Sequence, residues 1–168
     1  MNKEDLAFRM TMMLSHDEKQ QIMDLWNREY PAKLAYHNLT AFEKYIDELE
    51  KPIHMLVGLN DQVVGWATKF ERDQARWFVL ILSSSIHRQG IGSLVMDRLK
   101  KYESLLYAWV IDHNRDVKVN GKSYISPLNF YLKHGFEIIS DERLELPTLS
   151  AVKISWVNRR DRDNRSNT

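Results

Sequence analysis

The chain has 168 residues, of which 43% are hydrophobic and 11% aromatic, so it can bury the core of one domain. Charge is nearly balanced, with 24 Lys and Arg against 23 Asp and Glu, which disfavours nucleic acid or an anionic membrane surface as a partner. The lack of cysteine excludes disulfides, thiolate metal sites and a cysteine nucleophile. With no signal sequence or membrane-length apolar run, we expect a cytoplasmic protein that acts on small molecules.

The first third of the chain predicts one strand and two helices. Residues 6–14 alternate loosely between apolar and polar types, which indicates a strand at or near a sheet edge. The motif Ser15-x-x-Glu18 has the pattern of a capping box and starts a helix that Pro31 should end. The motif Thr40-x-x-Glu43 repeats that pattern and predicts a second helix.

The middle third changes to strand patterns. Two apolar runs, 53–59 and 63–70, flank Asn60-Asp61 and predict a hairpin. A further strand over 76–83 leads through a glycine-bearing turn into a segment with helical apolar spacing. Residues 105–111 are apolar on both faces, as in a buried strand, so we expect a mixed sheet.

The last third predicts a loop, a short helix and a hairpin. Residues 113–125 are polar and should form an irregular surface loop near the strand ends. Ser126 and Pro127 indicate the start of a helix over 127–134, which Gly135 ends in the left-handed conformation. Strands are expected at 136–140 and 149–157, and the polar tail 158–168 should be disordered.

Gly90-Ile91-Gly92, at the start of the central helix, has the features of an anion site. Glycines leave the backbone uncovered, so free N–H groups and the positive end of the helix can converge on a phosphate or pyrophosphate. An ordinary strand-to-helix turn is about equally compatible with a lone Gly-x-Gly. Val95 stands where a dinucleotide fingerprint needs a small residue, and Ser93-Leu94 does not complete a P-loop.

Two motifs in this order carry a resemblance to a known family. Arg88-Gln89-Gly90-Ile91-Gly92 is similar to the acetyl-CoA pyrophosphate loop of the GCN5-related N-acetyltransferase (GNAT) superfamily, and Asn129-Phe130-Tyr131-Leu132-Lys133-His134-Gly135-Phe136 resembles its Phe-Tyr-x-Lys-x-Gly-Phe segment. The resemblance spans roughly residues 6–156. It implies a single α/β domain over 1–157, with a mixed, mostly antiparallel sheet of about seven strands and about four helices.

The resemblance also implies an activity. The chain is expected to be an N-acetyltransferase that moves the acetyl group of acetyl-CoA directly to a primary amine in a ternary complex, without a covalent intermediate and without a metal. A backbone N–H near Leu82 would stabilise the oxyanion, and Tyr131, with an ordinary pKa of about 10, would be the general acid for the departing thiolate. The residues expected to bind the cosubstrate are Leu82, Ser83, His87, Arg88, Gln89, Gly90, Ile91, Gly92, Ser93 and Tyr131.

Several alternatives stay open from the sequence. Tyr131 could be a core aromatic, and the fold could serve as a non-catalytic acyl-CoA sensor. A protein-interaction or nucleic-acid module is disfavoured by the balanced charge. The general base could be a water relay or one of five side chains, namely Asp112, His113, Glu71, Asp73 and His54.

The acceptor is not determined by the sequence. Polyamines, amino acids, aminoglycosides, small toxins and protein N-termini are all compatible, as are a monomer and a homodimer. Tyr124 and Pro127 replace residues usual in the family, which indicates a subfamily with its own acceptor pocket. The loop 113–125 is longer than typical and is expected to shape the acceptor side of the cleft.

Overall fold

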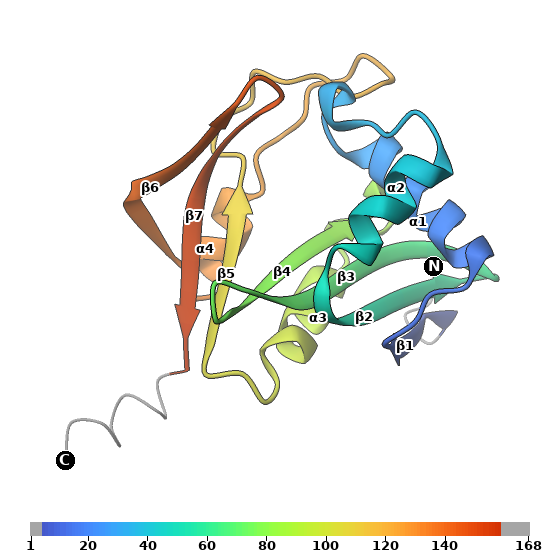
Figure 1. Cartoon of the computed structure of the whole chain (residues 1–168), viewed down its shortest axis with the longest axis horizontal. Coiled ribbons are helices and arrows are strands. Elements are labelled where there is room, and N and C mark those ends of the chain that lie inside the picture. The colour runs from blue at the N-terminus through green and yellow to red at the C-terminus, as the bar shows by residue number, and fades with distance from the viewer. Residues whose placement is uncertain (1–4, 159–168) are drawn as a thin grey trace.

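Residues 5–158 are described by a computed structural model, which contains a seven-stranded sheet in the order β1-β2-β3-β4-β5-β7-β6 (Figure 1). The strands are β1 (Ala7–Thr11), β2 (Glu50–Leu59), β3 (Gln62–Arg72), β4 (Ala75–Leu82), β5 (Leu105–Val110), β6 (Glu137–Leu146) and β7 (Leu149–Val157). The helices are α1 (His16–Glu29), α2 (Leu39–Asp47), α3 (Ile91–Lys100) and α4 (Leu128–Lys133), with 3-10 turns η2 (Ala32–Leu34) and η3 (Ser84–Ile86). Only the β4–β5 pair of this sheet is parallel. The predicted mixed, mostly antiparallel sheet is confirmed.

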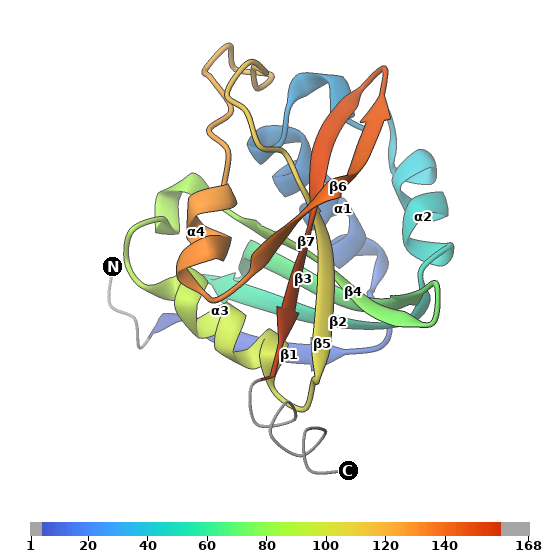
Figure 2. The same cartoon turned by 90° about the vertical axis from the view of Figure 1, so that its left-hand side faces the viewer.

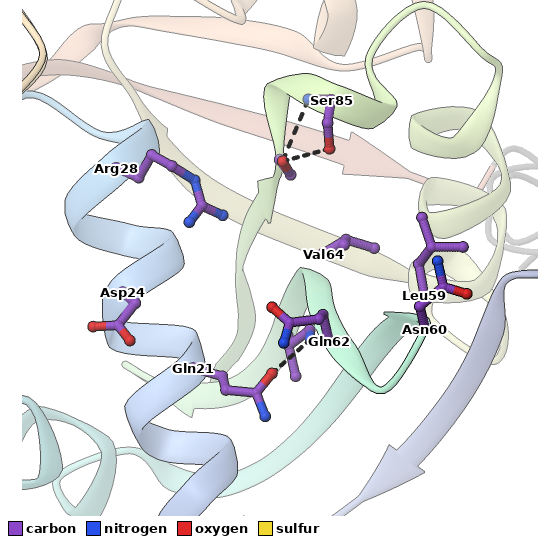
Figure 3. Close-up of a pocket in the computed structure, with 10 residues that line it drawn as sticks. Gln21, Asp24, Arg28, Leu59, Asn60, Gln62, Val64 and Ser85 are labelled. Carbon is purple, nitrogen blue, oxygen red and sulfur yellow. Dashed lines mark hydrogen bonds between the residues drawn. The ribbon is translucent and has the colours of Figure 1, made fainter. Parts of the chain in front are cut away.

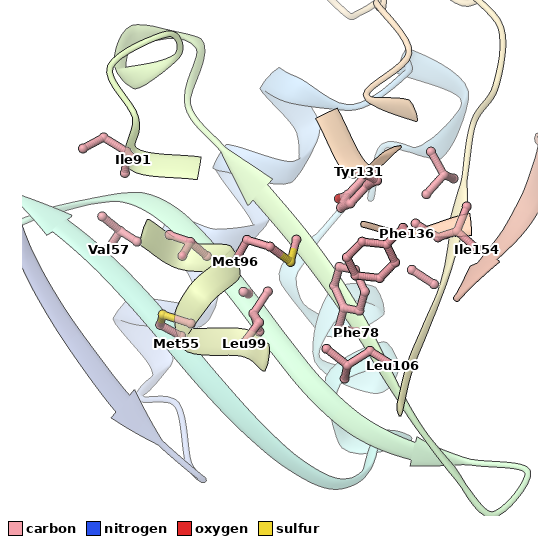
Figure 4. Packing of buried hydrophobic residues seen from close by; sticks show 14 of the residues in the cluster. Met55, Val57, Phe78, Ile91, Met96, Leu99, Leu106, Tyr131, Phe136 and Ile154 are labelled. Carbon is pink, nitrogen blue, oxygen red and sulfur yellow. The ribbon is translucent and has the colours of Figure 1, made fainter. Parts of the chain in front are cut away.

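The helices form two layers, with α1 and α2 on one face of the sheet and α3 and α4 on the other (Figure 2). Alternate residues of β4 point to opposite faces. Phe78 belongs to the core under α3 and α4, whereas Trp77 and Ile81 belong to the core under α1 and α2. Each face therefore has its own hydrophobic cluster, and Figure 4 shows the one that contains Phe78.

One of the two predicted capping boxes is present. Ser15 accepts a hydrogen bond from the Glu18 amide, and the Glu18 carboxylate accepts one from the Ser15 amide. The second prediction is wrong, because α2 starts earlier: the Asn38 side chain caps it by accepting from the Ala41 amide at 2.9 Å. Asn38 occupies the N-cap position, from which a side chain can accept from first-turn amides, whereas Thr40 already lies inside the helix.

The predicted edge position of β1 and the β2–β3 hairpin are both confirmed. Asn60 and Asp61 have φ values of 50° and 61°, as a two-residue hairpin turn requires. The strand predicted at 136–140 extends to Leu146 as β6, across an irregularity between Ile139 and Arg143 that the alternation pattern does not reveal.

The loop 113–125 is more ordered than predicted. Val117 pairs with Ser123 in an isolated bridge, and Gly121 occupies the turn between them with a φ of 79°. Of the predicted polar tail, residues 159–168 lie outside the part of the chain that the structure describes. Within residues 5–158, no helix combines the length and apolar character needed to cross a membrane.

Candidate active site

The sheet opens between its two parallel strands. β4 and β5 are paired at a single position, Trp77 with Tyr107. Both views show the strands separating toward their carboxyl ends (Figures 1 and 2). We call this region, formed by residues 78–82 and 108–110, the β4–β5 split.

The backbone of Leu82 faces the split. The Ser83 amide donates to the Val64 carbonyl at 2.8 Å, and Leu82 lies opposite Gly65 on β3. Because successive residues of an antiparallel pair bond to alternate sides, the N–H and C=O of Leu82 point away from β3 and toward the side of β5. The Leu82 amide can therefore reach a group placed between β4 and β5.

The residues that follow β4 form a turn into α3, and we call residues 87–93 the glycine turn. The first intrahelical bond runs from the Leu94 amide to the Gly90 carbonyl at 3.3 Å. The amides of Ile91, Gly92 and Ser93 precede it, so they have no carbonyl within the helix. Together with the positive end of the helix they suit a diphosphate.

The two glycines of this turn have different surroundings. Gly90 caps α3 with a φ of 78°, a left-handed conformation that glycine adopts without strain. At Gly92, a Cβ atom would lie 3.0 Å from Cε2 of Phe130 on α4. Gly92 therefore allows α3 and α4 to pack closely, a requirement separate from ligand binding.

Other side chains of the glycine turn hold its shape. The His87 ring Nε2 donates to the Leu82 carbonyl at 2.9 Å, and the Gln89 side chain donates to the Ser85 carbonyl at 3.1 Å. The Ser93 hydroxyl bonds Nε2 of His134 on α4 at 3.0 Å. Ser83, which follows β4 and precedes the glycine turn, is buried, and its hydroxyl lies 2.8 Å from that of Ser85.

Arg88 and Ile91 are at opposite extremes of solvent exposure within the glycine turn. Arg88 is exposed and has a φ of 59°, which is rare for a side chain other than glycine. Ile91, the first residue of α3, is fully buried, so its side chain belongs to the core and does not contact a ligand.

Tyr131 lies on α4 and is 6% exposed. Its ring packs against Phe78 at 5.8 Å and Phe136 at 5.7 Å between ring centroids (Figure 4). Burial, and secondarily the nearby Tyr124, raises the pKa of the Tyr131 hydroxyl. The expected ordinary pKa is thus wrong, because the hydroxyl sits in a poorly hydrated environment that disfavours phenolate.

Each of the five candidate bases has a feature that makes it poorly suited to that role. Asp112 receives two hydrogen bonds from Arg143, which lower its carboxyl pKa. Glu71 and Asp73 lie at the opposite end of β4 from Leu82, about 23 Å away at the usual strand rise. His54 is buried on β2, which lowers its pKa to about 4. The Nδ1 atom of His113, the fifth candidate, already accepts from the Arg115 amide at 3.3 Å.

A residue that sequence reasoning missed, Glu29, connects three segments at the end of β4. Its Oε1 accepts from the Ser84 amide at 3.0 Å, and its Oε2 accepts from Lys118 at 2.8 Å. Burial alone would raise its pKa, but the bonds from Lys118 and Ser84 outweigh this and lower it. A carboxylate in the last turn of a helix is disfavoured by the helix dipole. That unfavourable position was the available signal in the sequence.

A hollow of about 390 Å³ lies between α1 and the residues that follow β4 (Figure 3). Gln21, Asp24 and Arg28 line it from α1, Asn60 from the β2–β3 turn, and Ser85 from η3. No residue of the glycine turn contributes to it. The hollow is therefore separate from the free amides at the start of α3.

Comparison with known proteins identifies the family. The sequence profile described as "Acetyltransferase (GNAT) family" matches residues 19–136, which include the split and both motifs. The chain belongs to the GNAT family. It is accordingly an acyltransferase with acetyl-CoA as its cosubstrate, and the free amides of α3 fit the diphosphate of that molecule. Among residues 5–158, no group of three or more His, Asp or Glu side chains could hold a metal ion.

Solved structures of several acetyltransferases and an acyltransferase have the same fold. An aminoglycoside 6'-N-acetyltransferase complexed with coenzyme A is 16% identical, with a TM-score of 0.66 over 90% of this chain and 96% of its own. Aminoglycoside acetyltransferase AAC(6')-Ib in complex with coenzyme A is 17% identical, with a TM-score of 0.61 over 95% and 99%. An acyl-CoA N-acyltransferase from Pseudomonas aeruginosa is 13% identical, with a TM-score of 0.61 over 89% and 98%. No protein of curated function matches the sequence.

Proposed function

We propose that this GNAT protein transfers the acetyl group of acetyl-CoA directly to a primary amine, without a covalent enzyme intermediate. The observation that carries the proposal is the Leu82 backbone, which faces the β4–β5 split at the end of β4. A thioester carbonyl placed there would lie near an amide donor, with the diphosphate held at the start of α3.

The chemistry assigns a role to each group. Acetyl-CoA supplies the acetyl group and a thiolate that can depart. The Leu82 amide stabilises negative charge on the carbonyl oxygen while the amine nitrogen forms its bond to the carbonyl carbon. Tyr131 gives a proton to the departing sulfur as the carbon–sulfur bond breaks. The amine loses a proton to solvent, and Tyr131 regains one from solvent.

The pKa of Tyr131 affects this role in two ways. Since burial raises it, the hydroxyl stays protonated throughout the neutral range, as an acid must. The same shift makes proton release costlier, because the phenolate is poorly solvated. We therefore expect the proton to move only as charge develops on the sulfur.

The test is an assay of CoA release by the wild type and by Tyr131→Phe, with a panel of amines that includes kanamycin, spermidine and phenylethylamine. Kanamycin is included because two similar structures are aminoglycoside acetyltransferases. Loss of a positioned general acid should lower kcat by about 10²- to 10⁴-fold. Acetyl-CoA affinity, measured by calorimetric titration, should change little.

Two outcomes would contradict the proposal. Acetyl-CoA binding without turnover of any amine by the wild type would favour an acyl-CoA sensor. Wild-type turnover by Tyr131→Phe, under conditions in which chemistry limits the rate, would leave Tyr131 as a core aromatic.

A further inference from the structure

Two tyrosines lie on opposite faces of the sheet near the end of β4. Tyr131 belongs to the core under α3 and α4, whereas Tyr30 directly follows α1 and packs against the core of the other face. Burial is the main cause of the raised pKa of Tyr30, and the charges of Tyr124 and Tyr131 contribute to it. Glu29, the residue before Tyr30, accepts from the Ser84 amide at the end of β4 at 3.0 Å. The Tyr131 ring packs against Phe78 of β4 at 5.8 Å between ring centroids. The two tyrosines therefore lie on opposite faces of the sheet beside the β4–β5 split.

Tyr124, from the loop 113–125, completes a hydroxyl cluster with Tyr30 and Tyr131. Its side chain is buried, and its ring lies 6.2 Å from that of Tyr30, centroid to centroid, in an edge-on arrangement. Within residues 5–158, none of the three hydroxyls has a hydrogen-bond partner, and none is among the fully enclosed unpartnered atoms. The hydroxyl oxygens are thus free to accept hydrogen bonds from a ligand.

Two carboxylates near the cluster are paired with lysines. Glu29 pairs with Lys118 at 2.8 Å, and Asp116, whose side chain is 9% exposed, pairs with Lys33 at 2.7 Å. The second oxygen of Asp116 is fully enclosed. An acceptor that reaches the cluster therefore meets neutral hydroxyls instead of free negative charge.

We propose that the hydroxyls of Tyr30 and Tyr124 bind the attacking nitrogen of the acceptor on the α1 side of the split. A neutral primary amine has two N–H donors and one lone pair, and each hydroxyl oxygen can accept one N–H. Binding both N–H groups leaves the lone pair free to point at the carbonyl held by Leu82. This inference rests on the proposed function and adds the residues that position its acceptor.

The same arrangement selects a substrate class. Neutral hydroxyls stabilise an ammonium ion less than a carboxylate does, so the reactive uncharged amine is favoured. A polycation would gain little from the paired carboxylates Glu29 and Asp116. The acceptor is therefore a primary monoamine, in preference to a polyamine or an aminoglycoside.

The test compares Tyr30→Phe and Tyr124→Phe with the wild type, using phenylethylamine and saturating acetyl-CoA. Each variant should lose roughly tenfold in kcat/KM for the amine, the value of one hydrogen bond, with acetyl-CoA affinity unchanged. Neither should lower the thermal midpoint, because no protein partner is lost. Tyr36→Phe is the control, since the Tyr36 ring packs against Phe42 and Tyr45 of α2, at 5.2 and 6.0 Å between ring centroids. Phenylethylamine should also exceed spermidine and kanamycin in kcat/KM.

Wild-type kcat/KM in both variants, or a higher kcat/KM for spermidine or kanamycin than for phenylethylamine, would overturn the inference. If the wild type turns over no amine, the proposed function fails. The inference is then tested by the binding of phenylethylamine alone. In protein with ¹³C-labelled tyrosine rings, phenylethylamine should shift the resonances of Tyr30 and Tyr124 but not that of Tyr36. Unshifted Tyr30 and Tyr124 resonances would overturn the inference by themselves.

Discussion

Gly90 and Gly92 stand one residue apart, yet the structure requires glycine at the two positions for different reasons. Gly90 needs its left-handed φ of 78°, whereas Gly92 leaves room for Phe130. A bulky residue at Gly92 would therefore disturb the packing of α3 on α4 before it affected any ligand. Position 92 is consequently a poor place to test diphosphate binding alone.

Gly92→Ala should lower the free energy of unfolding by about 1–3 kcal/mol, as overpacking typically does. The new Cβ would lie 3.0 and 3.1 Å from two ring atoms of Phe130. Phe130→Leu should recover part of this loss in the double variant. Chemical denaturation of the wild type, both single variants and the double variant measures the coupling. Strictly additive effects would show that the Phe130 ring is not the obstacle.

At the scale of elements, the loop 113–125 is hydrogen-bonded to the end of α1 and to η2. The Ala32 amide donates to the Val117 carbonyl at 2.8 Å, and Pro31 forms an isolated bridge with Lys118. The Glu29–Lys118 pair adds an ionic link that also reaches Ser84. These contacts place the loop beside the α1 side of the split, which supports our expectation that it shapes the acceptor site.

The Glu29–Lys118 link should make stability depend on pH in the acid range. The folded pKa of Glu29 is below its ordinary 4.5, so its contribution is present above the unfolded pKa and is lost as pH falls through the folded pKa. Lys118→Met should cost about 1.5–3 kcal/mol at neutral pH. That difference from the wild type should disappear at strongly acid pH.

Denaturation across pH 3–7, a span of about four units around the ordinary Glu pKa, measures this dependence. Lys51→Met is the matched control, because the Lys51–Glu71 pair is exposed and should contribute little at any pH. Equal behaviour of the two variants would mean that the buried link adds no more stability than a surface pair.

At the scale of the whole molecule, the β4–β5 split lies between two hydrophobic cores, one on each face of the sheet. One contains Tyr131 and the residues under α3, and the other contains Trp26 and the residues under α1 and α2. The glycine turn lies at the end of β4, a strand that contributes side chains to both. A cosubstrate bound there should stabilise the fold as a unit.

Acetyl-CoA should therefore raise the thermal midpoint of the full chain. At 100 times its dissociation constant, the gain is about 2.7 kcal/mol. Gly90→Val should lose this gain, because a branched side chain covers the α3 amides. Gly121→Val is the control, since Gly121 has a similar φ of 79° but nothing within 4 Å. Loss of the gain in both variants would attribute it to backbone strain instead of the binding site.

The sequence alone predicted the order of the elements and the place of the glycine turn. Those features depend on local signals, such as apolar periodicity, the Ser15 cap and the Gly90 and Gly135 positions, which act within a few residues. The family resemblance rests on the same local motifs. The mixed sheet followed because segment 105–111 is apolar on both faces.

Only the tertiary structure decided which side chains meet. Glu29 and Lys118 are 89 positions apart, and no local pattern reports that their charges pair beside Ser84. The rings of Tyr30 and Tyr124 come within 6.2 Å of each other, a contact between distant segments that neither segment contains by itself. Burial, which sets the pKa of Tyr131, likewise arises from the packing of α4 on the sheet.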